Sequence, residues 1–311
     1  MKTLFYQIII FSLLALIGTS CQDDIEIFIP EVLENDKANI RSFLNQNPDR
    51  YILDIGETSQ FLSTNNGLII EIPSEGLLNE DGSRFTGKVL LEMAEIETKY
   101  SFFNYELTSQ TERSYLIPER IFKINFSHQG KSLKINENNP VFVKTIDSDK
   151  MIPMHIFCWE NKQWDITRPA SFIKWKSVLG ENSIEEFGYS VQITKNGWYA
   201  IGHEPFNIAE PGSEICTKTS NQFGAANTIG FLFLKNKTIS IPLIWSEKES
   251  AFCTDKIAPS EVESGVFVLM SWQNKKHYFG IKYIDSAVSK ITPCDLTPAT
   301  PEQILTEISK L

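Results

Sequence analysis

The chain has 311 residues, a formal net charge of −10 and 12% aromatic residues, 21 of its side chains being Phe. The acidic balance argues against binding of nucleic acid, which requires a clustered basic surface, and against adhesion to anionic lipid. The length is sufficient for two ordinary domains. The aromatic content favours β-strands over helices.

The first twenty residues have the three parts of a secretory signal peptide. Lys2 supplies a positive charge, residues 4–17 are almost entirely apolar, and Gly18-Thr19-Ser20 are small. A helix of the length of 4–17 spans about 21 Å, which is less than the hydrocarbon core of a bilayer. We therefore expect residues 1–20 to be a signal peptide that is removed, not a permanent anchor.

Cys21 directly follows the small residues, and residues 17–21 resemble the lipobox of bacterial lipoproteins. Ser20 fits that motif, whereas Gly18 stands where Leu is usual. The resemblance implies that Cys21 is lipidated and becomes the first residue of the mature chain. Several acyl chains would hold the protein stably in a membrane, since one chain alone binds marginally. The alternative is ordinary cleavage, with Cys21 incidental.

Gln22, Asp23 and Asp24 come next. A glutamine and two acidic residues after the lipidated cysteine resemble the export signal of Bacteroidota lipoproteins. The resemblance implies an outer-membrane, lipid-anchored protein that is exposed on the cell surface. The alternative is a solvated acidic linker on a lipoprotein that faces the periplasm.

Residues 21–50 read as a lipid tether followed by a short helix, which Asp36 caps and which extends to about Asn45. Strand signals dominate from residue 51 onward, where apolar and polar residues alternate. A first β domain is expected over residues 51–207. Its predicted strands are 68–72, 88–96, 122–126, 133–135, 141–146, 152–159, 164–166, 187–194 and 198–201.

Three short polar segments predict tight turns in this domain. Asn196-Gly197 is the strongest two-residue hairpin signal of the chain and would join 187–194 to 198–201. Gln129-Gly130 would turn the chain into 133–135. If Asn161-Lys162 also form a two-residue turn, Trp159 pairs with Trp164 and both indoles lie on one face. We expect a buried pair; the alternative is a solvent-facing platform for sugar.

A loop-like stretch over residues 207–221 separates a second β domain, expected over 208–311. Its connections at Asn236-Lys237 and Asn274-Lys275 are short. Four strands are predicted, at 229–234, 238–245, 265–272 and 276–284.

The C-terminus contains a clear helix signal. Thr300 can cap the helix, Pro301 takes its first position and Gln303 follows three residues after the cap. Ile304 and Ile308 lie on one apolar stripe with Leu305 and Leu311. So short a helix is marginal alone, so we expect the stripe to dock on the second domain's sheet.

The fold expected from these patterns is all-β, with two β-sandwich domains, a short N-terminal helix and a C-terminal helix. Residues 67–73, Gly76 and residues 87–92 are similar to the opening of ZU5-like modules, Ig-like sandwiches found in Bacteroidota surface lipoproteins. The sequence departs from that pattern at residues 73–76, where those modules usually have Pro-x-Gly-Ala. The resemblance covers about 58–205 and implies a module that binds partners or packs on neighbouring domains.

Four cysteines follow Cys21, and in an oxidising compartment they permit two disulfides with three connectivities. Cys158 lies in an apolar run, where a buried thiol is equally natural. The candidates for a bridge are therefore Cys216, Cys253 and Cys294.

The sequence indicates no cofactor, no metal site and no catalytic set. His203-Glu204 lacks the spacing of a zinc protease. The acidic loops 79–82 and 147–149 contain oxygen ligands suited to calcium, but neither has the full alternating pattern. Solvated turns are the expected reading of both loops.

The expected function is therefore that of a non-enzymatic, lipid-anchored cell-surface protein that binds a partner or serves as a structural part of the outer envelope. The alternative is a glycan-binding accessory lipoprotein of a polysaccharide-uptake system. Its partners would be the membrane, through Cys21, and an unidentified protein or glycan, but no nucleic acid. Trp175 is the candidate for stacking on a ligand, while Trp198 and Trp245 are expected in the core.

Overall fold

The computed structural model describes residues 39–44, 47–147, 153–179, 182–205, 214–235, 237–255, 264–285 and 291–311, with the side chains of 176–179 and 182–184 left aside. These residues all belong to one compact unit, 36–311. Strands make up 55% of the described residues and helices 7%, and nearly all neighbouring strands are antiparallel, so the predicted all-β class is confirmed. Within the described ranges, no helix has the length and hydrophobicity needed to cross a bilayer.

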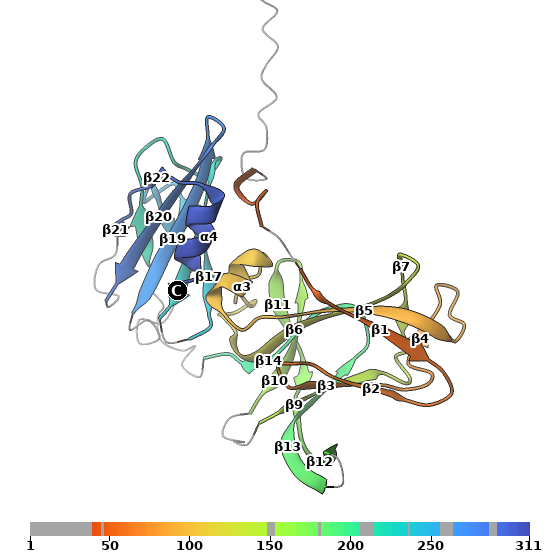
Figure 1. Cartoon of the computed structure of the whole chain (residues 1–311). Coiled ribbons are helices and arrows are strands. Elements are labelled where there is room, and N and C mark those ends of the chain that lie inside the picture. The colour runs from red at the N-terminus through yellow and green to blue at the C-terminus, as the bar shows by residue number, and fades with distance from the viewer. Residues whose placement is uncertain are drawn as a thin grey trace, which may run out of the picture. The chain divides into compact units, whose positions relative to one another are not determined.

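Two large sheets come from the part of the chain before residue 205 (Figure 1). The first has the order β1-β5-β6-β14-β10-β11, with β7 paired to β6, and the second has the order β12-β13-β9-β3-β2. A small sheet pairs β4 with β8. The strands are β1 (Asp49–Ile55), β2 (Gln60–Ser63), β3 (Leu68–Ile72), β4 (Leu77–Leu78), β5 (Gly87–Glu95), β6 (Ile117–His128), β7 (Lys131–Ser132), β8 (Lys134–Ile135), β9 (Val141–Ile146), β10 (His155–Glu160), β11 (Gln163–Pro169), β12 (Ser171–Leu179), β13 (Asn182–Ile193) and β14 (Gly197–His203).

One hydrophobic core lies between these two sheets. Successive side chains of a strand point to opposite faces, so every second residue of a strand faces inward. Ile70 of β3 and Val143 of β9 come from the second sheet, Leu91 of β5 and Ile124 of β6 come from the first, and all four are fully buried in the same cluster. The predicted alternation therefore places the apolar residues of both sheets in a shared interior.

The third sheet comes from the part of the chain after residue 214 and has the order β21-β15-β18-β17-β16-β19-β20-β22. Its neighbours are antiparallel except β15 and β21, which are parallel. The strands are β15 (Cys216–Lys218), β16 (Thr228–Leu234), β17 (Ser240–Ser246), β18 (Ala251–Cys253), β19 (Gly265–Gln273), β20 (Lys276–Ile284), β21 (Ile291–Pro293) and β22 (Thr297–Pro298).

Strands β16 and β17 separate near the middle of this sheet. Their pairing ends at Gly230 and Leu243. From there β16 continues along β19 as far as Thr228, whereas β17 pairs with β18, where Trp245 lies opposite Phe252. The sheet is therefore split locally, and the residues at the split lack a neighbouring strand on one side.

Two helices lie entirely within the described residues: α3 (Lys99–Asn104), which Thr98 caps, and α4 (Pro301–Ile308). The predicted capping box of Thr300 and Gln303 at the start of α4 is confirmed. Ile304 and Ile308 are buried, and they share a hydrophobic cluster with residues of β16, β19 and β20. Figure 1 shows α4 lying over β19 and β20, so the expected docking of the apolar stripe on the sheet that follows residue 214 is also confirmed.

The hairpin at Asn161-Lys162 has the predicted register. Both turn residues have positive φ, 49° and 66°, as a tight two-residue hairpin requires. Trp159 of β10 pairs with Trp164 of β11, and Trp164 is fully buried as expected. The turns Gln129-Gly130 and Asn274-Lys275 likewise have positive φ at both residues and connect β6 to β7 and β19 to β20.

The hairpin predicted at Asn196-Gly197 is wrong. The strands on its two sides belong to different sheets, since β13 pairs with β9 and β12 while β14 pairs with β6 and β10. The side-chain amide of Asn196 instead bonds the connection between β13 and β14 to a third segment. Its Oδ1 accepts a hydrogen bond from the backbone amide of Phe126 at 3.0 Å, and its Nδ2 donates one to the carbonyl of Leu133 at 2.9 Å. A local turn signal does not say which sheet the next strand will join.

Two further expectations meet the structure only in part, and two others cannot be compared with it. Of the predicted strand 133–135, Lys134–Ile135 pairs with β4, so it does not extend the hairpin with β6. In the predicted helix 36–45, residues 39–40 are helical and 41–43 form a turn. The predicted domain boundary at 207/208 and Asn236 of the predicted turn lie outside the described residues.

Candidate ligand-binding groove

A groove of about 800 Å³ opens where β16 and β17 separate. One wall consists of residues of these two strands, including Gly230 and Trp245. The other contains the segment that follows α3, residues 105–110, and the end of the β10–β11 hairpin. Cavities of roughly 300–1,000 Å³ are typical of small-molecule sites, so the volume suits a ligand larger than a single small ring.

Five aromatic residues line this groove: Phe231 and Phe252 are buried, and three others on different segments are more accessible. Trp159 ends β10, Tyr105 follows α3 and Trp245 lies on β17, and all three are partly buried. Each ring packs against a second aromatic ring. The centroid distances are 5.2 Å from Trp159 to Trp164, 5.1 Å from Tyr105 to Trp198 and 5.0 Å from Trp245 to Phe252. Such tilted or edge-on contacts hold a ring in place while part of it remains accessible.

Trp164 joins the hairpin to the groove's neighbouring segment. Its indole Nε1 donates to the carbonyl of Thr108 at 2.7 Å, and its backbone amide donates to the carbonyl of Gln110 at 2.8 Å. Both Thr108 and Gln110 line the groove. The buried indole of Trp164 therefore positions the segment that contains Thr108 and Gln110. Its ring contact also holds the ring of Trp159 at the groove.

The groove is lined by equal numbers of positively and negatively charged side chains. Arg41 and Lys162 are the cations, and Glu106 and Glu247 are the carboxylates. Arg41 Nη1 lies 2.6 Å from Glu106 Oε2. Burial, with a further contribution from the charge of Asp49, raises the pKa of Tyr105, so its phenol stays protonated at neutral pH. The groove thus combines aromatic surface with neutral and paired polar groups.

Trp175, the predicted stacking residue, lies elsewhere. It is on β12, is partly buried and does not line the groove; its Nε1 donates to Glu186 Oε2 at 2.9 Å. Trp198 and Trp245, which are expected in the core, do pack against hydrophobic core clusters, but both are only partly buried. The apolar strand around Trp245 is typical of a core strand, but the split beside β17 leaves this ring incompletely covered.

The outer face of the second sheet exposes two large apolar side chains. Phe61 is 64% exposed and Ile146 is 46% exposed. The strand register places Trp175 on the same face. Lys144 and Glu71 form an ion pair of 2.7 Å among these residues. The outward positions of a solvated antiparallel sheet are usually polar, and Phe61 and Ile146 depart from that pattern.

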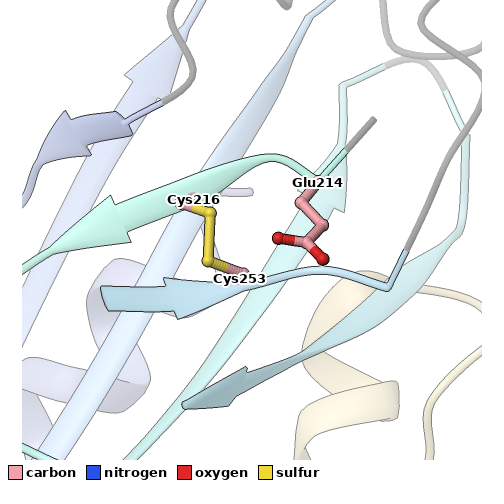
Figure 2. Close-up of side chains that lie close together, drawn as sticks. All are labelled: Glu214, Cys216 and Cys253. Carbon is pink, nitrogen blue, oxygen red and sulfur yellow. A yellow bond between two sulfur atoms is a disulfide. The ribbon is translucent and has the colours of Figure 1, made fainter. Parts of the chain in front are cut away.

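The structure joins Cys216 and Cys253 in a disulfide between the paired strands β15 and β18 (Figure 2). The third candidate, Cys294, is a buried free thiol, and so is Cys158. Burial raises the pKa of Cys294 to about 11, with the charge of Asp295 adding to it. A thiol of that pKa remains protonated and unreactive at neutral pH.

Figure 2 shows the carboxylate of Glu214 beside this disulfide. One potential ligand atom from each of Glu214, Cys216 and Cys253 lies within 4.8 Å of the others. Metal ions bind cysteine as thiolate, and here the two sulfurs are bonded to each other. The cluster in this oxidised form is therefore a disulfide with an acidic neighbour.

The acidic loop 79–82 forms a turn held by its own side chains. Asp81 Oδ1 accepts hydrogen bonds from the amide of Ser83 at 2.9 Å and from its hydroxyl at 2.6 Å. These hydrogen bonds lower the pKa of Asp81. Residues 148 and 149 of the other acidic loop lie outside the described residues, as do Cys21, Gln22, Asp23 and Asp24.

Comparisons with protein-family models, with curated proteins and with solved structures find no match to this chain.

Proposed function

We propose that this chain is a non-enzymatic lipoprotein that is anchored in the outer membrane through Cys21, displayed on the cell surface and engaged in binding a partner. The proposed localisation is based on the signal peptide, the lipobox-like residues 17–21 and the acidic residues Asp23 and Asp24. We also propose that its two large β regions are β-sandwich domains, the first of the Ig-like or ZU5-like type. The core shared by the first two sheets supports that arrangement.

The aromatic groove is the observation that carries the binding role. Three partly buried rings, Tyr105, Trp159 and Trp245, line one cavity, and each is held by a second ring. Rigid aromatic surface of this kind favours recognition because little side-chain freedom is lost on binding. Arg41 and Glu106 are already paired with each other, so acid–base use of either would first require breaking that pair.

A glycan-binding accessory of a polysaccharide-uptake system is the second candidate. Its specific support is that two tryptophans, Trp159 and Trp245, line the same groove. The outer face of the second sheet, with Phe61 and Ile146 exposed, supports instead a protein partner. The two surfaces are formed by different strands, so variants of one leave the other intact.

Surface display is tested by protease treatment of intact cells. Changing Asp23 and Asp24 to Ala together should protect the protein from an added protease while its total amount stays constant. The matched control changes Asp54 and Glu57 to Ala, which removes the same charge from exposed residues of the folded part. Equal cleavage of wild type and the Asp23/Asp24 variant would contradict the export signal.

A further inference from the structure

The groove's three partly buried aromatic rings lie on segments that are distant in the sequence. Tyr105, Trp159 and Trp245 are each partly buried and each backed by another ring at 5.0–5.2 Å. A ring that served only to fill the core would be covered on both faces. Here each ring packs against an aromatic neighbour and also lines a shared cavity. The ligand must therefore offer flat apolar surface at several points.

The polar lining indicates what else the ligand must offer. Thr108 and Gln110 are uncharged groups that can both donate and accept hydrogen bonds. The ion pair of Arg41 and Glu106 offers donors on one partner and acceptors on the other. Sugars have C–H faces that stack on aromatic rings and hydroxyls that donate and accept in turn. An aliphatic ligand would satisfy the rings but leave these polar groups without partners.

The charge of the groove selects between neutral and acidic ligands. Arg41 and Lys162 are matched by Glu106 and Glu247, and the whole chain has a net charge of −10. A polyanion would meet two carboxylates at the groove and a repulsive field on approach. A neutral ligand meets neither obstacle.

We propose that the groove binds a neutral oligosaccharide whose sugar rings stack on Trp159 and Trp245. This assignment names the ligand class of the binding site on which the proposed function rests. The separation of β16 from β17 is what creates the site, because it uncovers Trp245 and opens a cavity of about 800 Å³ beside the β10–β11 hairpin. A volume in the upper part of the usual range suits several linked sugars.

The test is a titration of the mature lipidated protein in detergent micelles. The probes are neutral hexasaccharides of α- and β-linked glucose, of xylose, of mannose and of N-acetylglucosamine, and one acidic hexasaccharide of galacturonic acid. Tryptophan fluorescence and calorimetry report binding. We expect saturable binding of at least one neutral hexasaccharide, and binding of the acidic one at least about ten-fold weaker, a difference of about 1.4 kcal/mol.

Variants locate the site. Trp159→Ala and Trp245→Ala should each weaken the binding by about ten-fold or more, as truncation of a central aromatic contact does. Trp175→Ala is the matched control, a partly buried tryptophan outside the groove, and should bind as wild type does. Circular dichroism confirms that each variant is folded, and Trp159→Phe, which keeps an aromatic ring, should retain most of the affinity.

Three results would overturn the assignment. The first is that folded protein shows no saturable binding of any neutral hexasaccharide up to about 5 mM, which corresponds to a binding free energy weaker than roughly 3 kcal/mol. The second is tighter binding of the acidic hexasaccharide than of the neutral ones, and the third is an equal loss of binding in Trp175→Ala and Trp159→Ala. Surface display is measured separately by protease treatment of cells. If the sugar titration shows no binding, the proposed lipid anchoring and surface display are unaffected. If the protein is not displayed on the cell surface, the result of the titration can still be interpreted.

Discussion

The indole rings of Trp159 and Trp164 lie 5.2 Å apart as a directly paired cross-strand couple, yet only Trp164 is fully buried. The difference arises because Trp164 packs beneath the segment after α3, to which its Nε1 donates at the Thr108 carbonyl. Trp159 keeps part of its surface at the groove. Trp164 therefore anchors the pair in the core, as predicted, whereas Trp159 is only partly buried and lines the groove.

Changing Trp164 to Ala should lower the free energy of unfolding by about 3–5 kcal/mol, because it removes a large buried side chain and leaves a cavity. Trp175→Ala should have a clearly smaller effect, since Trp175 is only partly buried. Chemical denaturation followed by circular dichroism measures both. A Trp164→Ala variant as stable as wild type would show that the anchor role is wrong.

The disulfide between Cys216 and Cys253 should stabilise the third sheet. It closes a loop with a sequence separation of 37, for which the chain-entropy model gives about 4 kcal/mol. We expect the double variant Cys216→Ser, Cys253→Ser to melt at a lower temperature than wild type. The control is Cys158→Ser, which removes a free thiol instead of the bridge.

The same bridge predicts a thiol count for the denatured mature protein, in which a lipidated Cys21 does not react. Two thiols, those of Cys158 and Cys294, should react before reduction, and the thiols of Cys216 and Cys253 should join them after it. A count of four without reductant would contradict the bridge.

Stability should fall in mildly acidic solution because of His277. Burial lowers its pKa below the ordinary value of 6.5, outweighing the opposing hydrogen bond to the Asn39 carbonyl. The unfolded chain therefore takes up a proton first, so the stability present above pH 6.5 is lost as the pH falls through 6.5 toward the lowered pKa. His277→Gln should reduce the loss of melting temperature between about pH 7 and about pH 5. His155→Gln is the control, and identical pH profiles of both variants and wild type would exclude this role for His277.

Much of the strand pattern could be predicted from the sequence because alternation reports directly which side chains face inward. Val141–Ile146 and Lys276–Ile284 are observed with the predicted bounds. The Asn161-Lys162 turn was equally predictable, since the polar pair lies between two apolar flanks and fixes the register of Trp159 and Trp164.

The groove could not be predicted in the same way. Its existence depends on β17 leaving β16 after Leu243 in order to pair with β18, and pairing choices between strands are not encoded in local alternation. The same limit explains the wrong hairpin at Asn196, whose amide binds segments around Phe126 and Leu133 that are far away in the sequence. Trp245 lies in an apolar strand, and only the split of the sheet uncovers it.

The proposed lipid on Cys21 is the central claim, because both the proposed membrane anchoring and the proposed surface role depend on it. Mass spectrometry of the mature protein isolated from its own cells measures this directly. We expect the chain to begin at Cys21 and to have the added mass of several acyl chains on that residue, and Cys21→Ser to lack both the added mass and the partition into detergent. A mature chain with an unmodified Cys21, or one that begins at another residue, would contradict the account.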